Sequence, residues 1–214
     1  MIKSPKFIAI VILGRPGSGK DTQAELLAKK FGLVHIISSK LIKKTLVTGK
    51  NKIKIKNKIY DVEEQRRRQH NGKLVAFSFV ASIVSDEITK LALKKHGIIM
   101  SGSLRSLTEL KTELLILHKL YRDKVFIFHV QISPKEVYIR NLKRRREDLP
   151  ELDTRKVIKK RLEAFDRYTL PVIKKLEKEK RIIKINGEQS IMKIHKDILM
   201  SLHQRITNPL RINE

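Results

Sequence analysis

Short apolar runs alternate along the chain with longer segments in which apolar residues recur every three or four positions. A short apolar run is typical of a strand buried on both faces, whereas the longer spacing is typical of an amphipathic helix. The strand-like runs are residues 7–13, 34–37, 98–100, 126–132 and 182–185. The helix-like segments are residues 22–30, 79–95, 107–120, 134–146, 154–179 and 190–204. This alternation predicts an α/β fold, a parallel five-stranded sheet flanked by helices.

Two polar segments interrupt the alternation. Residues 43–72 are highly charged and poor in apolar side chains, so we expect them to lie outside the central sheet as an insertion. Residues 144–153 are polar and contain Pro150, which separates two predicted helices. We therefore predict one domain over residues 1–214. Its core comprises residues 1–42, 73–143 and 154–214, with an insertion at about 43–72 and a short peripheral segment at about 144–153.

Positive charge dominates the composition. Lys and Arg total 48 against 22 Asp and Glu, which gives a net charge of +26, and 41% of the residues are hydrophobic, which argues against disorder. Such a charge attracts anions, whether nucleic acid, acidic membrane or phosphorylated small molecules. Lysine and isoleucine are both abundant, however, and the charge is spread along the whole chain. A compositional bias therefore explains the charge as well, and the charge alone identifies no partner.

The sequence contains no cysteine, which excludes disulfides, thiol catalysis and cysteine-based zinc sites. No apolar run approaches the roughly 18 residues that are needed to span a bilayer. The apolar run near the N-terminus leads into Gly14-Arg15-Pro16-Gly17 and is not followed by a small-residue cleavage pattern. We therefore expect a soluble, cytoplasmic protein that does not associate with a membrane.

The most specific motif lies between the first predicted strand and the first predicted helix. Glycines allow the backbone N–H groups of such a loop to converge on one point, the helix adds its positive N-terminal end, and a lysine adds a full charge. Strand, glycine-rich loop and helix together predict a P-loop that binds the polyphosphate of a nucleotide. The predicted ligands are Gly14, Pro16, Gly17, Ser18, Gly19, Lys20, Asp21 and Thr22.

One position of this loop departs from the general P-loop pattern, because the hydroxyl expected directly after Lys20 comes one residue later, at Thr22. Gly19-Lys20-Asp21-Thr22-Gln23, with Pro16 in the loop, resembles nucleoside monophosphate kinases, and adenylate kinases in particular. The resemblance extends over nearly the whole chain. It implies a P-loop NTPase-like fold that transfers the terminal phosphoryl group of Mg-ATP to AMP and gives two ADP. It also implies that the 43–72 insertion binds the acceptor nucleotide and that residues 144–153 form a short lid.

The resemblance also implies an acceptor site. Lys43 stands where the family has an arginine that binds the acceptor phosphate, and Lys40 replaces an aspartate. Ser101-Gly102-Ser103-Leu104-Arg105 resembles the loop whose arginine holds that phosphate, although Ser101 replaces a carboxylate that helps to arrange the metal. The acceptor-binding residues implied in this way are Ser38, Lys43, Lys73, Leu74, Val75, Gly102, Arg105, Glu109 and Arg161.

The donor side and the lid are implied in the same way. Arg140 and Arg144 lie four residues apart on one face of a predicted helix. In the family the first contacts the donor adenine and the second reaches phosphate, whereas the alternative is a solvated basic face. Arg146 resembles part of the motif that closes the lid. The implied catalytic residues are Lys20, Arg105, Arg144, Arg146 and Arg161. The lid is too short for the zinc-bearing form, so we expect no structural zinc.

The acceptor base and the metal ligand stay open. Adenylate kinases have a glutamine that reads adenine where this chain has Glu109, and a carboxylate suits guanine better because it cannot donate to N1. CMP, UMP or GMP are therefore alternatives to AMP. Mg²⁺ is implied between the donor phosphates, with Thr22 as the hydroxyl ligand. Asp21 either assists a metal-bound water or, as we favour, caps the helix.

A second class of function is a P-loop protein with weakened catalysis that binds RNA through its charge. Lys40 and Ser101 favour this interpretation, whereas the retained Lys20 and the spaced arginines oppose it. A steep loss of affinity with salt would identify nucleic-acid binding. We favour a monomeric kinase whose partners are ATP and a nucleoside monophosphate, with nucleic acid as the less favoured partner.

Overall fold

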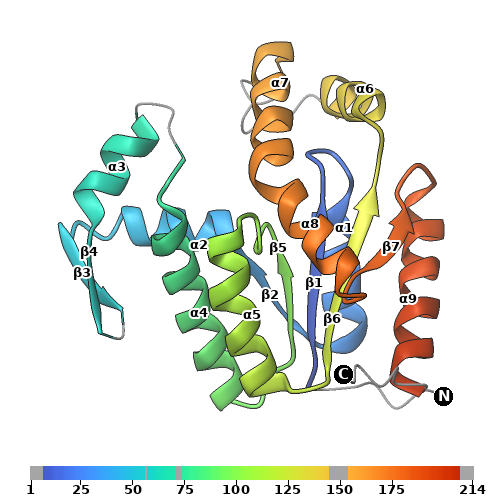
Figure 1. Cartoon of the computed structure of the whole chain (residues 1–214), viewed down its shortest axis with the longest axis horizontal. Coiled ribbons are helices and arrows are strands. Elements are labelled where there is room, and N and C mark those ends of the chain that lie inside the picture. The colour runs from blue at the N-terminus through green and yellow to red at the C-terminus, as the bar shows by residue number, and fades with distance from the viewer. Residues whose placement is uncertain (1–6, 56, 71–73, 145–153, 208–214) are drawn as a thin grey trace.

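A parallel five-stranded sheet forms the centre of the molecule (Figure 1). The computed structural model describes residues 7–55, 57–70, 74–144 and 154–207. The strands are β1 (Ala9–Gly14), β2 (Val34–Ile37), β5 (Ile98–Ser101), β6 (Val125–Gln131) and β7 (Ile183–Asn186), and they lie in the order β2-β5-β1-β6-β7. All four pairings between neighbours are parallel. The predicted α/β fold is therefore confirmed.

Strand β1 is buried on both faces because it lies in the middle of the sheet. On one face, Ile10 and Ile12 pack against α1 (Lys20–Phe31) and α9 (Ile191–Thr207). On the other face, Val11 packs in the cluster formed by α4 (Phe77–Leu93), α5 (Leu107–Tyr121) and α8 (Leu170–Lys178). The continuous apolar run at residues 7–13 thus reflects two cores, one on each side of the sheet.

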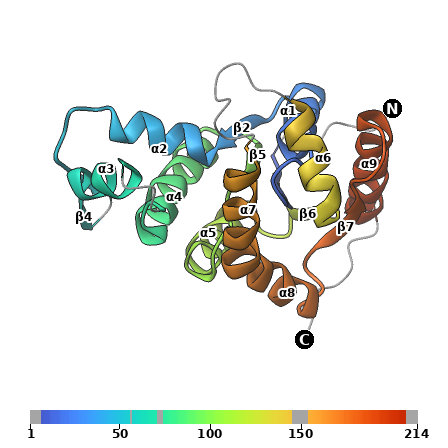
Figure 2. The same cartoon turned by 90° about the horizontal axis from the view of Figure 1, so that it is seen from above.

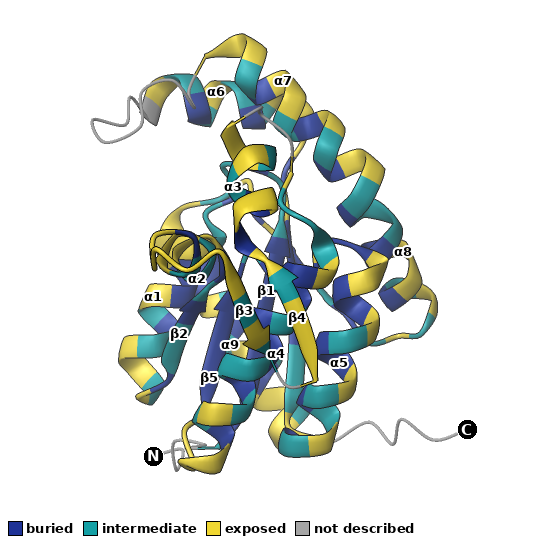
Figure 3. Cartoon of the chain, turned by 90° about the vertical axis from the view of Figure 1, so that its left-hand side faces the viewer, coloured by how far each residue is buried: buried dark blue, intermediate teal, exposed yellow. Residues whose placement is uncertain are grey.

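The polar segment after β2 folds into elements that the hydrophobic pattern did not predict. These are α2 (Ser38–Leu46), β3 (Lys52–Ile55), β4 (Lys58–Asp61) and α3 (Val62–His70). The hairpin of β3 and β4 is antiparallel and lies apart from the central sheet, at the left of Figure 1, and Figure 3 shows much of its surface as exposed. Ile53, Ile55 and Tyr60 pack against the main core, and the ring of Tyr60 meets that of Phe79 edge-on. A few inward side chains therefore anchor an otherwise charged segment.

The helix predicted over residues 154–179 consists of three parts: α7 (Arg155–Ala164), a π-helical turn η2 (Phe165–Thr169) and α8. Pro171 lacks the N–H group that would bond four residues back, and its ring clashes with that carbonyl. Just before this proline the helix forms a wider, π-helical turn, in which the N–H group of Leu170 donates to the carbonyl of Phe165, five residues earlier. Figures 1 and 2 show α7 and α6 (Pro134–Arg144) above the carboxyl ends of the strands.

Replacement of a β1 core side chain tests the two-sided packing. Ile10 is fully buried, so Ile10→Ala should lower the free energy of unfolding by about 2–5 kcal/mol. Leu115 on α5 is 71% exposed, and the matched substitution Leu115→Ala should change it by less than about 0.5 kcal/mol. Urea denaturation measures both. Equal losses in the two variants would contradict the described core.

Candidate active site

The loop of residues 15–19 turns the chain from the end of β1 into α1. This edge of a parallel sheet, at the carboxyl ends of its strands, is where α/β folds bind ligands. Gly19 is the N-cap of α1, in a left-handed conformation with φ 82°, and its carbonyl accepts from the N–H group of Gln23 at 3.0 Å. The positive end of α1 therefore faces the loop, as phosphate binding requires.

Gly17 could not be replaced by a larger residue without strain. Its φ is 81°, and a Cβ atom there would lie 2.5 Å from Nδ2 of Asn141. Asn141 comes from α6, is 1% exposed, and donates through Nδ2 to the carbonyl of Pro16 at 3.3 Å. Asn141 was not predicted as a site residue, although an amide among the apolar residues of a predicted helix was a signal available in the sequence. The contact fixes α6 against the loop.

A cavity of about 300 Å³ opens between this loop and the segment that follows β5. Lys20 and Asp21 line it from α1, Gly102 and Arg105 from the segment after β5, and Arg161 from α7. Three cationic side chains therefore share one cavity, which is suited to a polyanion because a ligand of opposite charge relieves their mutual repulsion.

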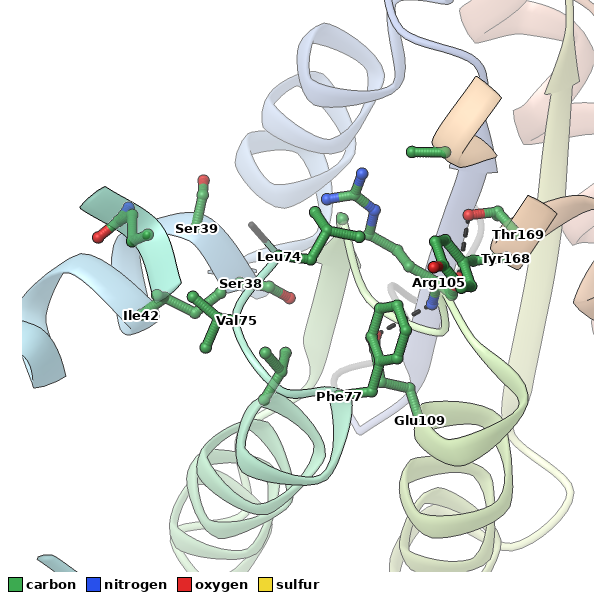
Figure 4. A pocket seen from close by; sticks show the side chains of 14 residues that line it. Ser38, Ser39, Ile42, Leu74, Val75, Phe77, Arg105, Glu109, Tyr168 and Thr169 are labelled. Carbon is green, nitrogen blue, oxygen red and sulfur yellow. Dashed lines mark hydrogen bonds between the residues drawn. The ribbon is translucent and has the colours of Figure 1, made fainter. Parts of the chain in front are cut away.

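A second cavity of about 220 Å³ adjoins the first (Figure 4). The two share four lining residues, which are Ser39, Gly102, Arg105 and Thr169. The rest of the second lining is largely apolar or aromatic and includes Ile42, Leu74, Val75, Phe77, Val80 and Tyr168. An apolar pocket next to an arginine is suited to a ligand with a flat ring and a phosphate.

The backbone of Arg105 is held on both sides. Its N–H group donates to Oε2 of Glu109 at 3.0 Å, and its carbonyl accepts from Oγ1 of Thr169 at 3.1 Å. Figure 4 shows Glu109 and Thr169 beside the backbone of Arg105, while the guanidinium extends away from both. The side chain of Arg105 thus starts from a fixed point and extends toward the polyanion cavity that it lines.

Glu109 is a helix-capping residue in this structure. Ser106 is the N-cap of α5, and its Oγ accepts from the N–H group of Glu109 at 3.2 Å. The same hydroxyl donates to Oε1 of Glu109 at 3.4 Å. This Ser-x-x-Glu pattern resembles a capping box, but the carboxylate accepts from the N–H group of Arg105, one residue before the N-cap. Glu109 lines the second cavity but is only 2% exposed. Both of its carboxylate oxygens already accept hydrogen bonds from the chain itself.

A second carboxyl group, Glu113, lies one turn further along α5. It is fully buried, and Oε2 accepts from the N–H group of Leu104 at 3.4 Å. Burial first, and then the negative charge of Glu109, raises the pKa of Glu113 well above its ordinary value of 4.5. Burial also raises the pKa of Glu109, although its bonds with Arg105 and Ser106 oppose the shift. Glu113 therefore keeps its proton to a higher pH than a solvated carboxyl group does.

The carboxyl ends of β2 and β5 are joined by hydroxyl groups. Nε2 of His35 lies 2.9 Å from Oγ of Ser101, and Oγ of Ser38 lies 2.7 Å from Oγ of Ser103. Burial lowers the pKa of His35, against the influence of Asp21. Ser101 therefore connects β2 and β5 at the edge of the polyanion cavity that it lines.

The sequence matches the adenylate kinase family over residues 12–181. The chain belongs to the adenylate kinase family. It is therefore an ATP-dependent nucleoside monophosphate kinase, a transferase. Of the helices that the structure describes, none is both long and apolar enough to cross a membrane.

Curated relatives are similar at modest identity. The chain is 30% identical over 179 residues to adenylate kinase isoenzyme 5 of Homo sapiens, an alignment that covers 84% of this chain and only 30% of that protein. It is 28% identical over 231 residues to the adenylate kinase of Buchnera aphidicola subsp. Cinara cedri (strain Cc), covering 93% of this chain and 99% of that one. It is 26% identical over 200 residues to adenylate kinase isoenzyme 1 of Oryctolagus cuniculus, covering 94% and 96%.

The structure of this adenylate kinase family member brings most of the predicted residues to the two cavities. Neither cavity lining includes Lys43, which is exposed on α2, or Thr22, which is exposed on α1. The loop residues Gly17, Ser18 and Gly19 are also absent from both linings. The capping interpretation of Asp21 is wrong, because Gly19 is the N-cap and Asp21 lies in the first turn. A carboxylate in that turn still interacts favourably with the positive end of the helix.

The predicted lid residues are only partly described. Arg140 donates through Nε to Glu136 at 2.6 Å and through Nη2 to the carbonyl of Gly187 at 2.8 Å, so it fixes α6 to the segment after β7. Arg144 is the last residue of α6. Lys73 and Arg146 lie outside the described residues. The polyanion cavity thus holds three of the predicted catalytic cations: Lys20, Arg105 and Arg161.

Kinases of this family use Mg²⁺ with ATP, and the residues present fit such an ion. Mg²⁺ binds oxygen ligands, often one or two carboxylates together with substrate phosphates. Asp21 lines the polyanion cavity and supplies such a carboxylate, whereas Thr22, the predicted hydroxyl ligand, is exposed on α1 and belongs to neither cavity lining. Among the described residues, no group of three or more His, Asp or Glu side chains could hold a metal by itself.

The raised pKa of Glu113 predicts a pH-dependent stability. The folded chain keeps this proton above pH 4.5, where the unfolded chain releases it, so the free energy of unfolding falls as the pH rises through that window. Glu113→Gln removes the titration. The stability of the variant relative to the natural chain should therefore increase from pH 5 to pH 8, by up to about 1.4 kcal/mol per pH unit.

Urea denaturation at the two pH values measures this difference. Glu163→Gln on α7 is the control, because the side chain of Glu163 is 62% exposed. Its relative stability should stay constant with pH. A difference for Glu113→Gln that does not grow with pH would show that Glu113 is ionised in the folded state.

Proposed function

We propose that this chain transfers the terminal phosphoryl group of Mg-ATP to AMP and forms two ADP. One observation carries the proposal: a cavity lined by Lys20, Arg105 and Arg161 adjoins an apolar pocket and shares Arg105 with it. A donor polyphosphate and an acceptor phosphate would meet in the first cavity, while the acceptor base occupies the second. Phosphoryl transfer depends mainly on such positioning and on neutralised charge, so no catalytic base is required.

The P-loop binds the donor. Backbone N–H groups of residues 17–20 surround the phosphates of ATP at the positive end of α1, and Lys20 reaches toward the transferred group. Gly14, Pro16, Ser18 and Gly19 shape this loop. When it is bound with ATP, Mg²⁺ would reduce the negative charge on the donor phosphates. Asp21, which lines the cavity, is the residue best placed to hold it, and Thr22 would reach it only if its hydroxyl turned toward the cavity.

The segment after β5 and the second cavity bind the acceptor. Arg105 holds the acceptor phosphate in line with the donor, because its backbone is fixed by Glu109 and Thr169. Leu74, Val75 and Phe77 contact the base from the insertion side. Ser38 borders this pocket, while Gly102 borders both cavities and lets the chain pass close to the phosphate.

The lid completes the arrangement. Arg161 contributes a third cation from α7, and Arg144 and Arg146 close over the phosphates from the lid segment. Arg140 fixes α6, the helix that precedes this segment in the chain, through its bond to the carbonyl of Gly187. Closure excludes water, which would otherwise hydrolyse ATP. Lys43 and Lys73 would approach the acceptor phosphate and base from the insertion when the site closes.

AMP is favoured over GMP because Glu109 is committed to the chain itself. A carboxylate that reads guanine must accept from two donors on the base, but both oxygens of Glu109 already accept hydrogen bonds from the chain. Glu109 is also only 2% exposed. The residue whose type favours guanine is therefore held away from the base, and AMP, the acceptor that the family resemblance implies, stays the first choice. GMP is the alternative acceptor if Glu109 turns toward the base in the complex.

A coupled assay of diphosphate formation with Mg-ATP and each of AMP, CMP, UMP and GMP tests the proposal. AMP should give the highest kcat/KM. Lys20→Ala should lower kcat by about 10²–10³-fold, because it removes a cation that neutralises charge in the transition state. Arg105→Ala should raise the KM for the acceptor by at least about tenfold, with a smaller effect on the KM for ATP.

Lys111→Ala is the matched control, since Lys111 is an exposed cation on α5 that neither cavity lining includes. Its kinetic constants should stay within about twofold of the natural chain. If none of the four acceptors is phosphorylated by a protein that still binds ATP, the proposed function is contradicted. If GMP is the sole acceptor that is phosphorylated, the chain is a nucleoside monophosphate kinase whose acceptor is GMP instead of AMP.

A further inference from the structure

One helical turn touches both phosphate-binding segments. The π-helical turn η2 lies between α7 and α8, and its residues contact the P-loop on one side and the Arg105 segment on the other. Phe165 lines the polyanion cavity, Tyr168 lines the apolar pocket, and Thr169 lines both. π-turns are rare and frequently mark functional sites.

Arg15 makes the contact on the P-loop side. Its Nη2 lies 3.6 Å from Oδ1 of Asp166, and its guanidinium carbon lies 5.5 Å from the ring centroid of Phe165. Nη1 donates to the carbonyl of Ile132, just beyond β6, at 2.8 Å. Neither Arg15 nor Asp166 lines the two cavities. Arg15 therefore links the P-loop to η2 and to the end of the sheet without facing the substrates.

Thr169 makes the contact on the other side. Its Oγ1 donates to the carbonyl of Arg105 at 3.1 Å, and the residue is 4% exposed. Thr169 also belongs to the same turn as Asp166, because the N–H group of Leu170 bonds back to the carbonyl of Phe165. Pro171, two residues after Thr169, has no N–H group to bond the carbonyl of Arg167, so a regular helix cannot continue unbroken through this point.

We propose that η2 sets the distance between the donor and acceptor phosphate sites, with Arg15, Asp166 and Thr169 as positioning residues. In-line transfer requires each phosphate to be positioned to within a fraction of an ångström. A small misplacement lowers the rate by a large factor. Because both contacts converge on one turn, a shift of the P-loop is transmitted to Arg105, and the reverse also holds. This proposal rests on the proposed function for its kinetic consequence but not for its structural one.

The isolated Arg15–Asp166 pair contributes little by itself. The side chain of Asp166 is 52% exposed, and exposed ion pairs contribute about 0–1 kcal/mol. The strongest perturbation of this side is therefore Arg15→Met, which removes the ion pair, the bond to Ile132 and the cationic contact with Phe165 together. Thr169→Val removes only the hydroxyl on the other side and keeps the volume of the side chain.

Hydrogen exchange of the ligand-free chain tests the coupling directly. Arg15→Met should accelerate exchange at the N–H groups of Leu104 and Arg105, and Thr169→Val should accelerate it at the N–H group of Ser18, each by at least about threefold. Thr169→Ser should restore natural exchange. Thr89→Val on α4 is the control, because that hydroxyl bonds only within its own helix and should change neither segment.

Effects confined to the segment that each substitution touches would overturn the proposal. If Arg15→Met fails to fold, Asp166→Asn replaces it, and the same reciprocal change is expected at smaller amplitude. This measurement needs no turnover, so it decides the proposal even if the natural chain phosphorylates no acceptor, which would contradict the proposed function alone.

In an active protein, a double-mutant cycle on kcat gives the kinetic counterpart. Arg15→Met and Thr169→Val should each lower kcat by about five- to tenfold. The double variant should stay within about twofold of the slower single variant, because either loss already misaligns the two sites. A loss equal to the product of the two single losses would show two independent local roles.

Discussion

Lys20, Arg105 and Arg161 line one cavity, and their mutual repulsion must be overcome by the fold that holds them. Each comes from a different part of the chain: the start of α1, the segment after β5, and α7. None could hold its place through contact with the others, since like charges repel. The parallel sheet solves this problem, because the carboxyl ends of β1 and β5 are neighbours and bring two of the three segments together.

Buried polar groups then fix the segments at the required distance. Asn141 holds the P-loop from α6, Glu109 and Thr169 hold both sides of the Arg105 peptide unit, and Glu113 accepts from Leu104. These groups are almost fully buried, so loss of one partner leaves another unsatisfied. Substrates would meet a site that is already organised, and the cost of ordering it is met during folding rather than during catalysis.

The sequence predicted the sheet and the P-loop because both follow from local patterns. The apolar run before Gly14 and the glycine spacing after it are each visible within a dozen residues. The hairpin of β3 and β4 was missed because only Ile53, Ile55 and Tyr60 face the core, too few for a periodic signal. Asn141, Thr169 and Glu113 were missed as positioning residues because their partners lie far away in the chain or, for Glu113, in a segment whose path depends on the fold.

The same limit applies to residues taken from the resemblance. Lys43 matches the motif position of an acceptor ligand, yet it is exposed on α2 and outside both cavity linings. Glu109 matches the position of a base-reading residue, yet its carboxylate oxygens accept from the N–H group of Arg105 and the hydroxyl of Ser106. A motif gives the residue type at a place in the chain, whereas burial and hydrogen bonding decide what that residue is free to do.

The most direct test of a joined donor and acceptor site is calorimetric binding of a ligand in which a phosphate chain links two adenosines. Because such a ligand occupies both cavities at once, it should bind one to one and at least about 100-fold more tightly than ATP. Affinity no greater than that of ATP would contradict the central claim that the two cavities form one phosphoryl-transfer site.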